Sequence, residues 1–251
     1  MLPYIHTTTR LVNTQTFQEI DVVNSCGNRS CPICSKVRSQ RLFSLYSPLF
    51  AVIEPSKLSL LTLTFPNTNT LSEGLFVLKN AVSHLRHQKL FKDKVKGGLA
   101  SIEVTYNQGW HVHVHMLLYS DFLIRKKLIK SWFKLTGGYI VDVRQVKTEP
   151  LQALNYILKY VQKGLKFRGV PPEQVDDFYY IYNATMYRFR SFFSFGCFYG
   201  VKKEKSPDWE SVDYLESLKK GVLFHKHSHS FSRFSDFLDE LSYKESRGLT
   251  F

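Results

Sequence analysis

At 251 residues the chain is long enough to bury a sizeable core, either as one domain or as a domain with an appendage. Its hydrophobic content of 43% is ordinary for a globular protein and excludes a largely disordered chain. Lys and Arg outnumber Asp and Glu by 34 to 21, and the formal net charge of +13 favours a polyanionic partner, nucleic acid before an anionic membrane.

No early apolar run is long enough for a signal peptide, and no stretch approaches the ~18 continuous apolar residues of a membrane span. We therefore expect a protein without a membrane partner that stays in the cytoplasm. Three of the four cysteines lie within nine residues of one another. In a reducing compartment this spacing favours a zinc site over disulfides.

The first predicted element is a short N-terminal hairpin that leads to the cysteine cluster. Cys31 and Cys34 form a CxxC knuckle, and two thiolates at this spacing can share a tetrahedral zinc ion with Cys26 as a third ligand. His6 is the first choice for the fourth ligand and Cys197 the second. The alternative interpretation is three reduced cysteines that bind no metal.

A basic helix is expected to follow Cys34, with its Lys and Arg side chains either at phosphates or simply solvated. Leu60–Phe65 alternates as a strand does. Thr70 and Glu73 fit a capping box, and the apolar positions that follow have helical spacing. The pair Gly97-Gly98 is expected to separate this helix from the next element.

Residues 103–115 read E-V-T-Y-N-Q-G-W-H-V-H-V-H, in which N-Q-G is a turn signal between two alternating runs. The pattern predicts a β-hairpin. With the turn centred on Gln108, Glu103 lies opposite His113, and alternation places four polar side chains on one face. These side chains are Glu103, His111, His113 and His115. A carboxylate among three imidazoles indicates a metal site, although solvated or purely structural histidines are the alternative.

An amphipathic helix should follow the hairpin, capped by Ser120 or Asp121 and ended by Gly137. A strand is predicted at Tyr139–Val146. This order of elements predicts an α+β fold in which an antiparallel sheet carries helices packed on one face.

The next helix begins at Pro150 and ends at Gly164. At 100° per residue, its polar side chains fall within an arc of about 100°. They are Tyr156, Lys159, Tyr160 and Lys163. A helix whose polar face consists of tyrosines and lysines is unusual, and the alternative interpretation is a solvated basic face with two amphipathic tyrosines.

The pattern weakens beyond this helix. Residues 178–188 have the pattern of a helix, and residues 192–199 that of a strand belonging either to the sheet or to the zinc element. Amphipathic patches at 208–219 and 231–243 suggest helices of a C-terminal appendage. The histidines of segment 225–229 are interpreted as a solvated tail, because the residues between them are hydrophilic and no carboxylate is paired with them.

Four motifs, in this order along residues 26–200, resemble those of the HUH endonucleases, and within them the rolling-circle replication initiators of plasmids and single-stranded DNA phages. The cysteine run from Cys26 and the strand at 60–65 are similar to initiator motifs. His113-Val114-His115 resembles the His-hydrophobic-His signature, and residues 156–163 resemble a Y-x-x-K-Y-x-x-K motif. The resemblance implies the HUH fold, with a central antiparallel sheet of ferredoxin or RRM-like type, flanking helices and an N-terminal zinc-binding element.

The resemblance also implies an activity, namely metal-dependent, site-specific nicking and strand transfer through a 5′-phosphotyrosine intermediate. Mg²⁺ or Mn²⁺ would be the catalytic ion and Zn²⁺ the structural one. The implied catalytic ligands are Glu103, His113 and His115, with His111 in a supporting or DNA-contacting role. The implied zinc ligands are Cys26, Cys31 and Cys34 with one further upstream cysteine. This chain has no cysteine there, and His6, across the proposed hairpin, is our choice for the fourth ligand.

On the helix, Tyr160 aligns with the nucleophile of one-tyrosine initiators and Tyr156 with the second nucleophile of two-tyrosine enzymes. Lys163 and Lys159 would place positive charge near the phenols and the phosphate. We expect Tyr160 to make the first nick, because its Y-x-x-K pairing with Lys163 matches both groups.

The expected partners are single-stranded or hairpin origin DNA, with a host helicase and polymerase, in the host cytoplasm or nucleoid. Three parts are expected: a zinc-binding element with a basic helix at 1–50, an endonuclease core at 51–200 and a helical appendage at 201–251. Two alternatives stay open. One is a two-tyrosine transposase of the same superfamily, and the other is a non-catalytic, zinc-containing nucleic-acid-binding module.

Overall fold

The computed structural model forms two compact units, which we describe separately. Among the described residues, the larger unit comprises residues 28 and 30–201, and the smaller comprises residues 7–13, 15–26, 202 and 209–211. The structure describes residues 7–13, 15–26, 28, 30–202 and 209–211. His6, the histidines of segment 225–229 and the patch at 231–243 lie outside the described residues, so their assignments stay predictions.

The smaller unit contains an antiparallel sheet in the order β2-β1-β9. Its strands are β1 (Thr8–Asn13), β2 (Glu19–Val23) and β9 (Trp209–Ser211). The β1–β2 pairing confirms the predicted N-terminal hairpin. The amphipathic patch at 208–219 was expected to be a helix. This expectation is wrong for residues 209–211, because their backbone pairs with the edge of β1 that β2 leaves open.

The larger unit is built on a mostly antiparallel sheet of six strands in the order β6-β3-β5-β4-β7, with β8 also paired to β4. The strands are β3 (Leu58–Thr64), β4 (Val95–Asn107), β5 (Trp110–Ser120), β6 (Val141–Gln145), β7 (Lys166–Arg168) and β8 (Phe192–Gly196). Only the short β7 runs parallel to its neighbour among these described strands. The strand predicted at 192–199 corresponds to β8. It was expected to belong either to the sheet or to the zinc element, and its pairing with β4 assigns it to the sheet.

Helices lie between these strands along the chain. They are α1 (Pro32–Phe50), α2 (Leu71–His87), α3 (Lys89–Lys92), α4 (Arg125–Thr136), α5 (Pro150–Gln162) and α6 (Val175–Met186), with short 3₁₀ turns at Pro55–Lys57 and Pro172–Gln174. Thr70 caps α2 as predicted, since its hydroxyl accepts from the Glu73 N–H. Within the described part of the chain, no helix combines the length and apolarity that a membrane span requires.

The predicted cap of α4 is wrong. The helix begins at Arg125, and the residue before it, Ile124, makes no side-chain capping bond. Asp121 is too early to cap because the segment after the hairpin first runs extended and buries Leu123 at 4% exposure. The C-terminal prediction is confirmed, since Gly137 adopts a left-handed φ of 72° at the end of the helix.

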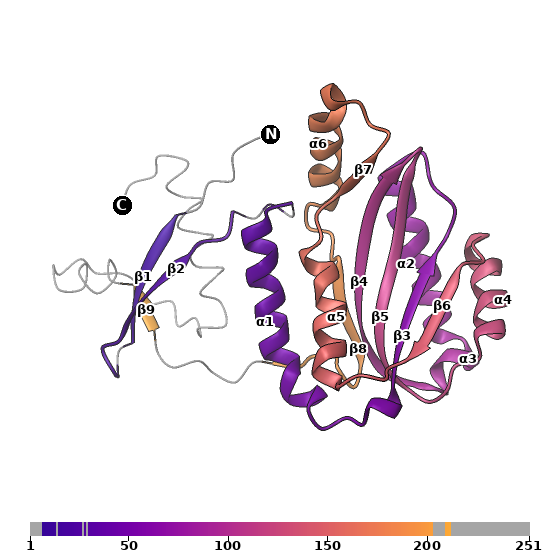
Figure 1. Ribbon diagram of the computed structural model, residues 1–251, viewed down its shortest axis with the longest axis horizontal. Helices are drawn as coiled ribbons and strands as arrows, with labels where there is room; N and C mark the ends of the chain where they lie inside the picture. The colour runs from indigo at the N-terminus through magenta and orange to yellow at the C-terminus, as the bar shows by residue number, and fades with distance from the viewer. Residues whose placement is uncertain (1–6, 14, 27, 29, 203–208, 212–251) are drawn as a thin grey trace. The chain divides into compact units, whose positions relative to one another are not determined.

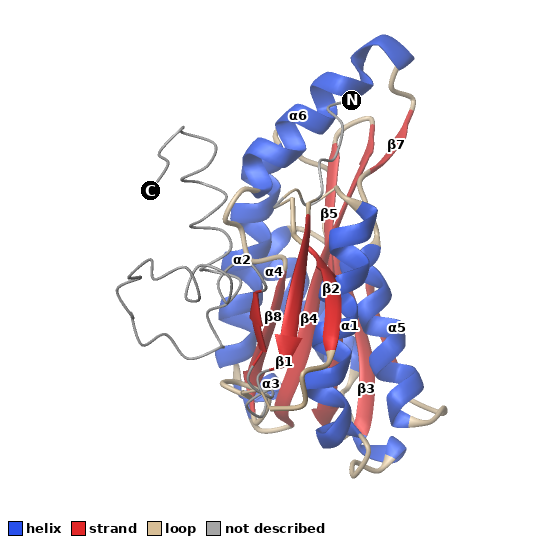
Figure 2. Ribbon diagram, turned by 90° about the vertical axis from the view of Figure 1, so that its left-hand side faces the viewer, coloured by secondary structure: helices blue, strands red, loops and turns tan. Residues whose placement is uncertain are grey.

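Helices cover both faces of the sheet, so the expectation of one covered face is also wrong (Figures 1 and 2). The side chains of α2 and α4 pack in one cluster with Leu63, Val114 and Met116. Those of α1 and α5 pack in a second cluster with Leu99 and Leu117. The layer of α1 and α5 forms because β4 and β5 carry apolar side chains on both faces at the ends away from the hairpin turn. Near the turn, one face of these strands is polar.

Gly97 and Gly98 do not form the separator that was expected, because both lie inside β4. A Cβ at Gly97 would sit 2.6 Å from the Cys197 sulfur, and one at Gly98 would sit 2.7 Å from a methyl group of Leu118. The glycine pair therefore serves close packing of β8 and the following turn against β4.

Candidate active site

The β4–β5 hairpin builds the polar half of the site. The structure confirms the predicted register, with Glu103 opposite His113 and Thr105 opposite His111. The turn is tight, and Gln108 and Gly109 both have positive φ, at 52° and 130°. This local geometry places the carboxylate and the imidazoles on the same face of the sheet, as alternation predicted.

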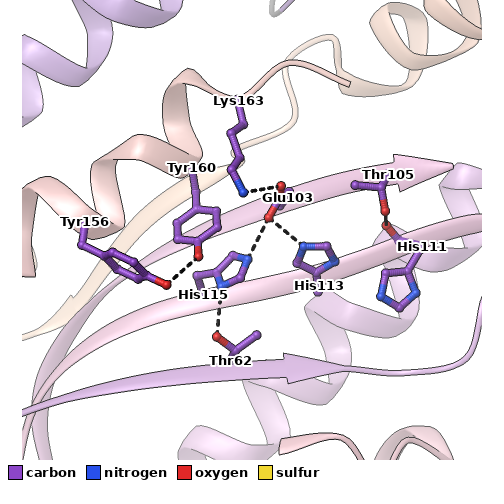
Figure 3. Close-up of polar contacts among 9 residues, drawn as sticks. All are labelled: Thr62, Glu103, Thr105, His111, His113, His115, Tyr156, Tyr160 and Lys163. Atoms are coloured by element: carbon purple, nitrogen blue, oxygen red, sulfur yellow. Dashed lines mark hydrogen bonds and ion pairs between the residues drawn. The ribbon is translucent and has the colours of Figure 1, made fainter. Parts of the chain in front are cut away.

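The Glu103 carboxylate is the centre of the site (Figure 3). Its Oε2 accepts hydrogen bonds from the Nε2 atoms of His113 and His115 at 2.8 and 2.9 Å. Its Oε1 accepts from the Lys163 ammonium at 2.8 Å. The Glu103 side chain is only 8% exposed, so this carboxylate is buried and fully partnered.

These residues fit a divalent cation. The ligand atoms of Glu103, His113 and His115 all lie within 4.8 Å of one another. The Thr62 hydroxyl lies 3.0 Å from His115 Nδ1 and can hold the proton there, which leaves Nε2 as a lone-pair donor. His113 Nδ1 is buried and has no hydrogen-bond partner among the described residues. The ring proton can therefore move from Nε2 to Nδ1, which frees Nε2 for a metal ion and gives up only the hydrogen bond to Glu103. A set of two imidazoles and a carboxylate suits Mn²⁺ and related ions, and tolerates Mg²⁺.

The environment shifts the pKa of two of these groups in the direction that metal binding requires. Burial alone would raise the pKa of Glu103, but hydrogen bonds from His113, His115 and Lys163 together hold it well below its usual range. Burial lowers the pKa of His115, which keeps that imidazole neutral. An ionised carboxylate and a neutral imidazole are the forms that bind cations.

Helix α5 supplies the second half of the site across the sheet face. Tyr160 is buried at 7% exposure, and its ring stacks on His115 with centroids 3.5 Å apart and an interplanar angle of 14°. Its hydroxyl donates to the Tyr156 hydroxyl at 3.0 Å, whereas Tyr156 itself is 42% exposed. The helix therefore brings both predicted tyrosines to the metal-ligand group, one turn apart.

The two phenols differ in acidity. Burial, with the hydrogen bond to Tyr156, raises the pKa of Tyr160 above its usual value. The hydrogen bond from Tyr160 lowers the pKa of Tyr156, with a further contribution from Lys159 and against an opposing effect of burial. Tyr156 is therefore the more acidic and the more accessible phenol of the pair.

Both predicted lysines border the tyrosines. Lys159 Nζ lies 3.5 Å from the ring centroid of Tyr156, and Lys163 Nζ lies 4.4 Å from that of Tyr160. Because Lys163 also pairs with Glu103, one ammonium joins the metal-ligand group to the tyrosine. Two ammonium groups are thus concentrated beside the two phenols and the metal-ligand group, where they favour an anionic ligand.

His111 lies beside the cluster and not in it. Its ring centroid is 5.1 Å from that of His113, and its Nδ1 is 2.8 Å from the side-chain oxygen of Asn67. Asn67 also donates to the Asn107 carbonyl at 2.8 Å, so it ties His111 to the hairpin turn. Neither Asn67 nor Thr62 was predicted as a site residue. No local pattern marks Asn67, whereas the alternation of Leu60–Phe65 could have placed Thr62 on the site face.

The cysteines form a second possible metal group. The sulfur atoms of Cys26, Cys31 and Cys34 lie within 4.8 Å of one another. Cys31 caps α1, and its sulfur accepts from the Cys34 N–H at 3.4 Å. Cys197 is exposed and does not belong to this group. The structure therefore supports the predicted trio and leaves its fourth ligand open.

Comparison with known proteins gives two matches. A family described as "Replication protein" matches residues 17–221 of the chain. The chain is also similar to "Protein rep" of Staphylococcus aureus, at 27% identity over 155 residues that cover 55% of this chain and 67% of that protein. No solved structure matches it significantly. The family match spans the hairpin, α5 and the cysteine trio together.

Proposed function

The chain belongs to the replication protein family, and from that premise we propose that it initiates rolling-circle replication of a plasmid or single-stranded DNA phage by nicking one strand of the origin. The observation that carries the proposal is the stacking of Tyr160 on His115, which sets a nucleophile against a group of metal ligands. The α+β sheet with this group on one face supports assignment to the HUH fold.

We assign the catalytic ion to Glu103, His113 and His115. Mg²⁺ or Mn²⁺ bound there supplies Lewis-acid polarisation of the scissile phosphate. Lys163 lies between the carboxylate and the Tyr160 ring, where its charge favours both a bound phosphate and a phenolate. Thr62 orients His115 through Nδ1.

The nick is a transfer of the phosphoryl group to a phenol. The Tyr160 oxygen attacks the phosphorus, a bond from this oxygen to phosphorus forms, and the bond from phosphorus to the 3′-oxygen breaks. The departing 3′-oxygen takes a proton from water, and the phenol proton leaves through the Tyr156 hydroxyl, to which it is already donated. The resulting 5′-phosphotyrosine keeps the phosphodiester energy, so a later hydroxyl can reverse the step.

Tyr156 has the second role. Its hydroxyl is 3.0 Å from that of Tyr160, so a phosphate within reach of one phenol is within reach of the other. We assign Tyr156 to the transfer that closes the displaced strand. Its lower pKa and greater exposure favour a second assignment, in which Tyr156 attacks first.

The test incubates the full chain with single-stranded origin DNA and Mn²⁺ and looks for a protein–DNA adduct that resists denaturant. Tyr160→Phe should lose the adduct and the first nick, whereas Tyr156→Phe should nick but fail to yield closed circles. The reverse result would assign the first attack to Tyr156. The absence of an adduct with the unchanged chain, on origin DNA that it binds, would overturn the proposal and favour the non-catalytic alternative.

We assign a structural zinc ion to the cysteine trio, with His6 as the proposed fourth ligand. Metal analysis should find about one zinc per chain, and Cys31→Ser should lose it together with cooperative folding. Cys197→Ser is the matched control, because this cysteine is exposed and outside the trio, and it should retain the zinc. A folded, active protein without zinc would contradict the assignment.

The proposed function names partners and a place of action. Origin DNA is the substrate, as a single strand or an exposed hairpin. In the host cytoplasm or nucleoid, a host helicase would separate the strands and a host polymerase would extend the free 3′-hydroxyl. The proposed division keeps the zinc element and basic helix at 1–50, the endonuclease at 51–200 and an appendage at 201–251. A transposon end, offered in place of origin DNA, tests the transposase alternative.

A further inference from the structure

The short strand β7, directly after α5, carries two cations on the face of the sheet that holds the site. Leu165 and Phe167 pack into the core cluster on the α2 side of the sheet. Side chains alternate along a strand, so Lys166 and Arg168 project from the opposite face, and both are exposed. The opposite face is the one that carries the Glu103 carboxylate.

The register places these cations in line with the site. Along β7, Lys166 pairs with Thr105 and Arg168 with Asn107. On β4, Glu103, Thr105 and Asn107 share one face, with same-face neighbours ~7 Å apart. Lys166 therefore lies about one such step beyond the metal-ligand group, and Arg168 about two.

This half of the face opens toward the hairpin turn. On β4, Leu99 and Glu103 are buried, Thr105 is half-buried and Asn107 is exposed. The cover supplied by α5 therefore ends near Glu103. Beyond it the face consists of polar side chains, among them His111, which Asn67 holds in place.

The charge on this open half is of one sign. On strands β4, β5 and β7 between the metal-ligand group and the turn, Glu103 is the one carboxylate, and Lys163 neutralises it. Among the residues that the structure describes, neither Lys166 nor Arg168 takes part in an ion pair. Unpaired cations in line with a phosphate-cleaving site are suited to further phosphates of the same strand.

The position of the tyrosines gives the strand a direction. In an in-line displacement the nucleophile and the leaving oxygen lie on opposite sides of the phosphorus. Figure 3 shows Tyr156 and Tyr160 on one side of the Glu103–His113 pair, with Thr105 and His111 on the other. With the scissile phosphate at the metal ligands, as proposed above, the leaving 3′-oxygen and the DNA attached to it would extend toward Thr105 and its neighbour Lys166 on β7.

We propose that Lys166 and Arg168 bind backbone phosphates of the substrate strand on the 5′ side of the nick, the flank that ends in the free 3′-hydroxyl. This inference rests on the proposed nicking function and adds the path and polarity of the DNA. Phosphate contacts carry no base information, so the two residues set affinity and register on the strand and leave sequence choice to other groups.

The first experiment needs no cleavage. Binding of a single-stranded thymidine homopolymer is measured against salt without added Mg²⁺ or Mn²⁺, for the full chain and for Lys166→Ala/Arg168→Ala. Removing one cation that binds a phosphate should reduce the slope of log K against log salt by about 0.7, hence roughly 1.4 for the double variant. The matched control is Lys126→Ala/Lys127→Ala, which removes the same charge from exposed positions of α4 and should leave the slope unchanged. Equal slope changes in the two double variants would overturn the proposal.

The second experiment tests the direction. Nicking of origin oligonucleotides is compared after stepwise shortening on either side of the nick. The β7 double variant should raise KM on substrates with a full 5′ flank, and this difference from the unchanged chain should vanish once that flank is removed. A difference that instead depends on the 3′ flank would overturn the assigned polarity. If the chain nicks nothing, the proposed function fails, whereas the homopolymer result still decides whether the two cations bind phosphates.

Discussion

The two faces of strand β5 have different roles, which alternate from one residue to the next. Val112, Val114 and Met116 face α2 and are at most 1% exposed, in a core built almost wholly of apolar and aromatic side chains. The alternate positions His113 and His115 carry imidazoles that share one buried carboxylate oxygen. One face supplies packing energy, and the other accepts the cost of buried polar groups to hold chemistry. Substitutions one residue apart should therefore produce opposite kinds of defect.

The largest expected effect is on the polar face. His113→Ala removes one ligand of the proposed catalytic ion and should reduce nicking by about 1,000-fold or more, roughly 4 kcal/mol of transition-state stabilisation. Binding of single-stranded DNA should change little. Adduct formation and a binding isotherm measure the two effects, and the exposed His84 of α2, changed to alanine, is the control. Full metal-dependent cleavage by both His113→Ala and His115→Ala would refute the metal assignment.

The opposite defect is expected at Met116, the residue that follows His115 on the same strand. Met116→Ala leaves a cavity beneath α2 and should lower the free energy of unfolding by about 2–5 kcal/mol. Nicking per folded molecule should stay near normal, because Met116 faces away from the site. Urea unfolding with an activity assay at low temperature checks both, and the 82% exposed Phe122, changed to alanine, should cost much less. A stable Met116→Ala protein with lost activity would contradict the division between the faces.

A smaller effect is expected where α2 touches β5. A Cβ on Gly74 would lie 2.8 Å from the Thr68 hydroxyl and 2.9 Å from a methyl group of Val112. Overpacking costs about 1–3 kcal/mol, and the helix propensity of alanine offsets about 1 kcal/mol of this. Gly74→Ala should therefore lower the melting temperature modestly, whereas Ser83→Ala, at an exposed position of the same helix, should not. A clear gain in stability in Gly74→Ala would show that the contact has room to relax.

The smallest effect is a pH dependence on the polar face. The pKa of Glu103 lies below its value of 4.5 in an unfolded chain, so its ionised form contributes stability that is present above pH 4.5. This contribution is lost as pH falls through the folded pKa. Without metal, Glu103→Gln should be less stable than the unchanged chain near neutral pH, and the two should converge in acid. Parallel curves from urea unfolding across this range would contradict the shift.

Local patterns predicted much of the site. Alternation and the N-Q-G turn placed Glu103 opposite His113, because the register of a tight hairpin depends on residues within one short segment. Helical periodicity likewise placed Tyr156 and Tyr160 on one face of α5. The cap of α4 failed for a tertiary reason, since burial of Leu123 keeps the preceding segment extended and moves the start of the helix.

The sequence by itself determined which residues share a face, since the periods of strand and helix are properties of the backbone. Only the tertiary structure decided what those faces meet. Lys163 reaches Glu103 across 60 positions of sequence, and Asn67 reaches His111 across 44. The choice of face for Lys166 and Arg168 likewise depends on the burial of Phe167 on the other side of the sheet. Such contacts arise from the packing of whole elements, which depends on shape and burial over the entire core and leaves no periodic signal in the chain.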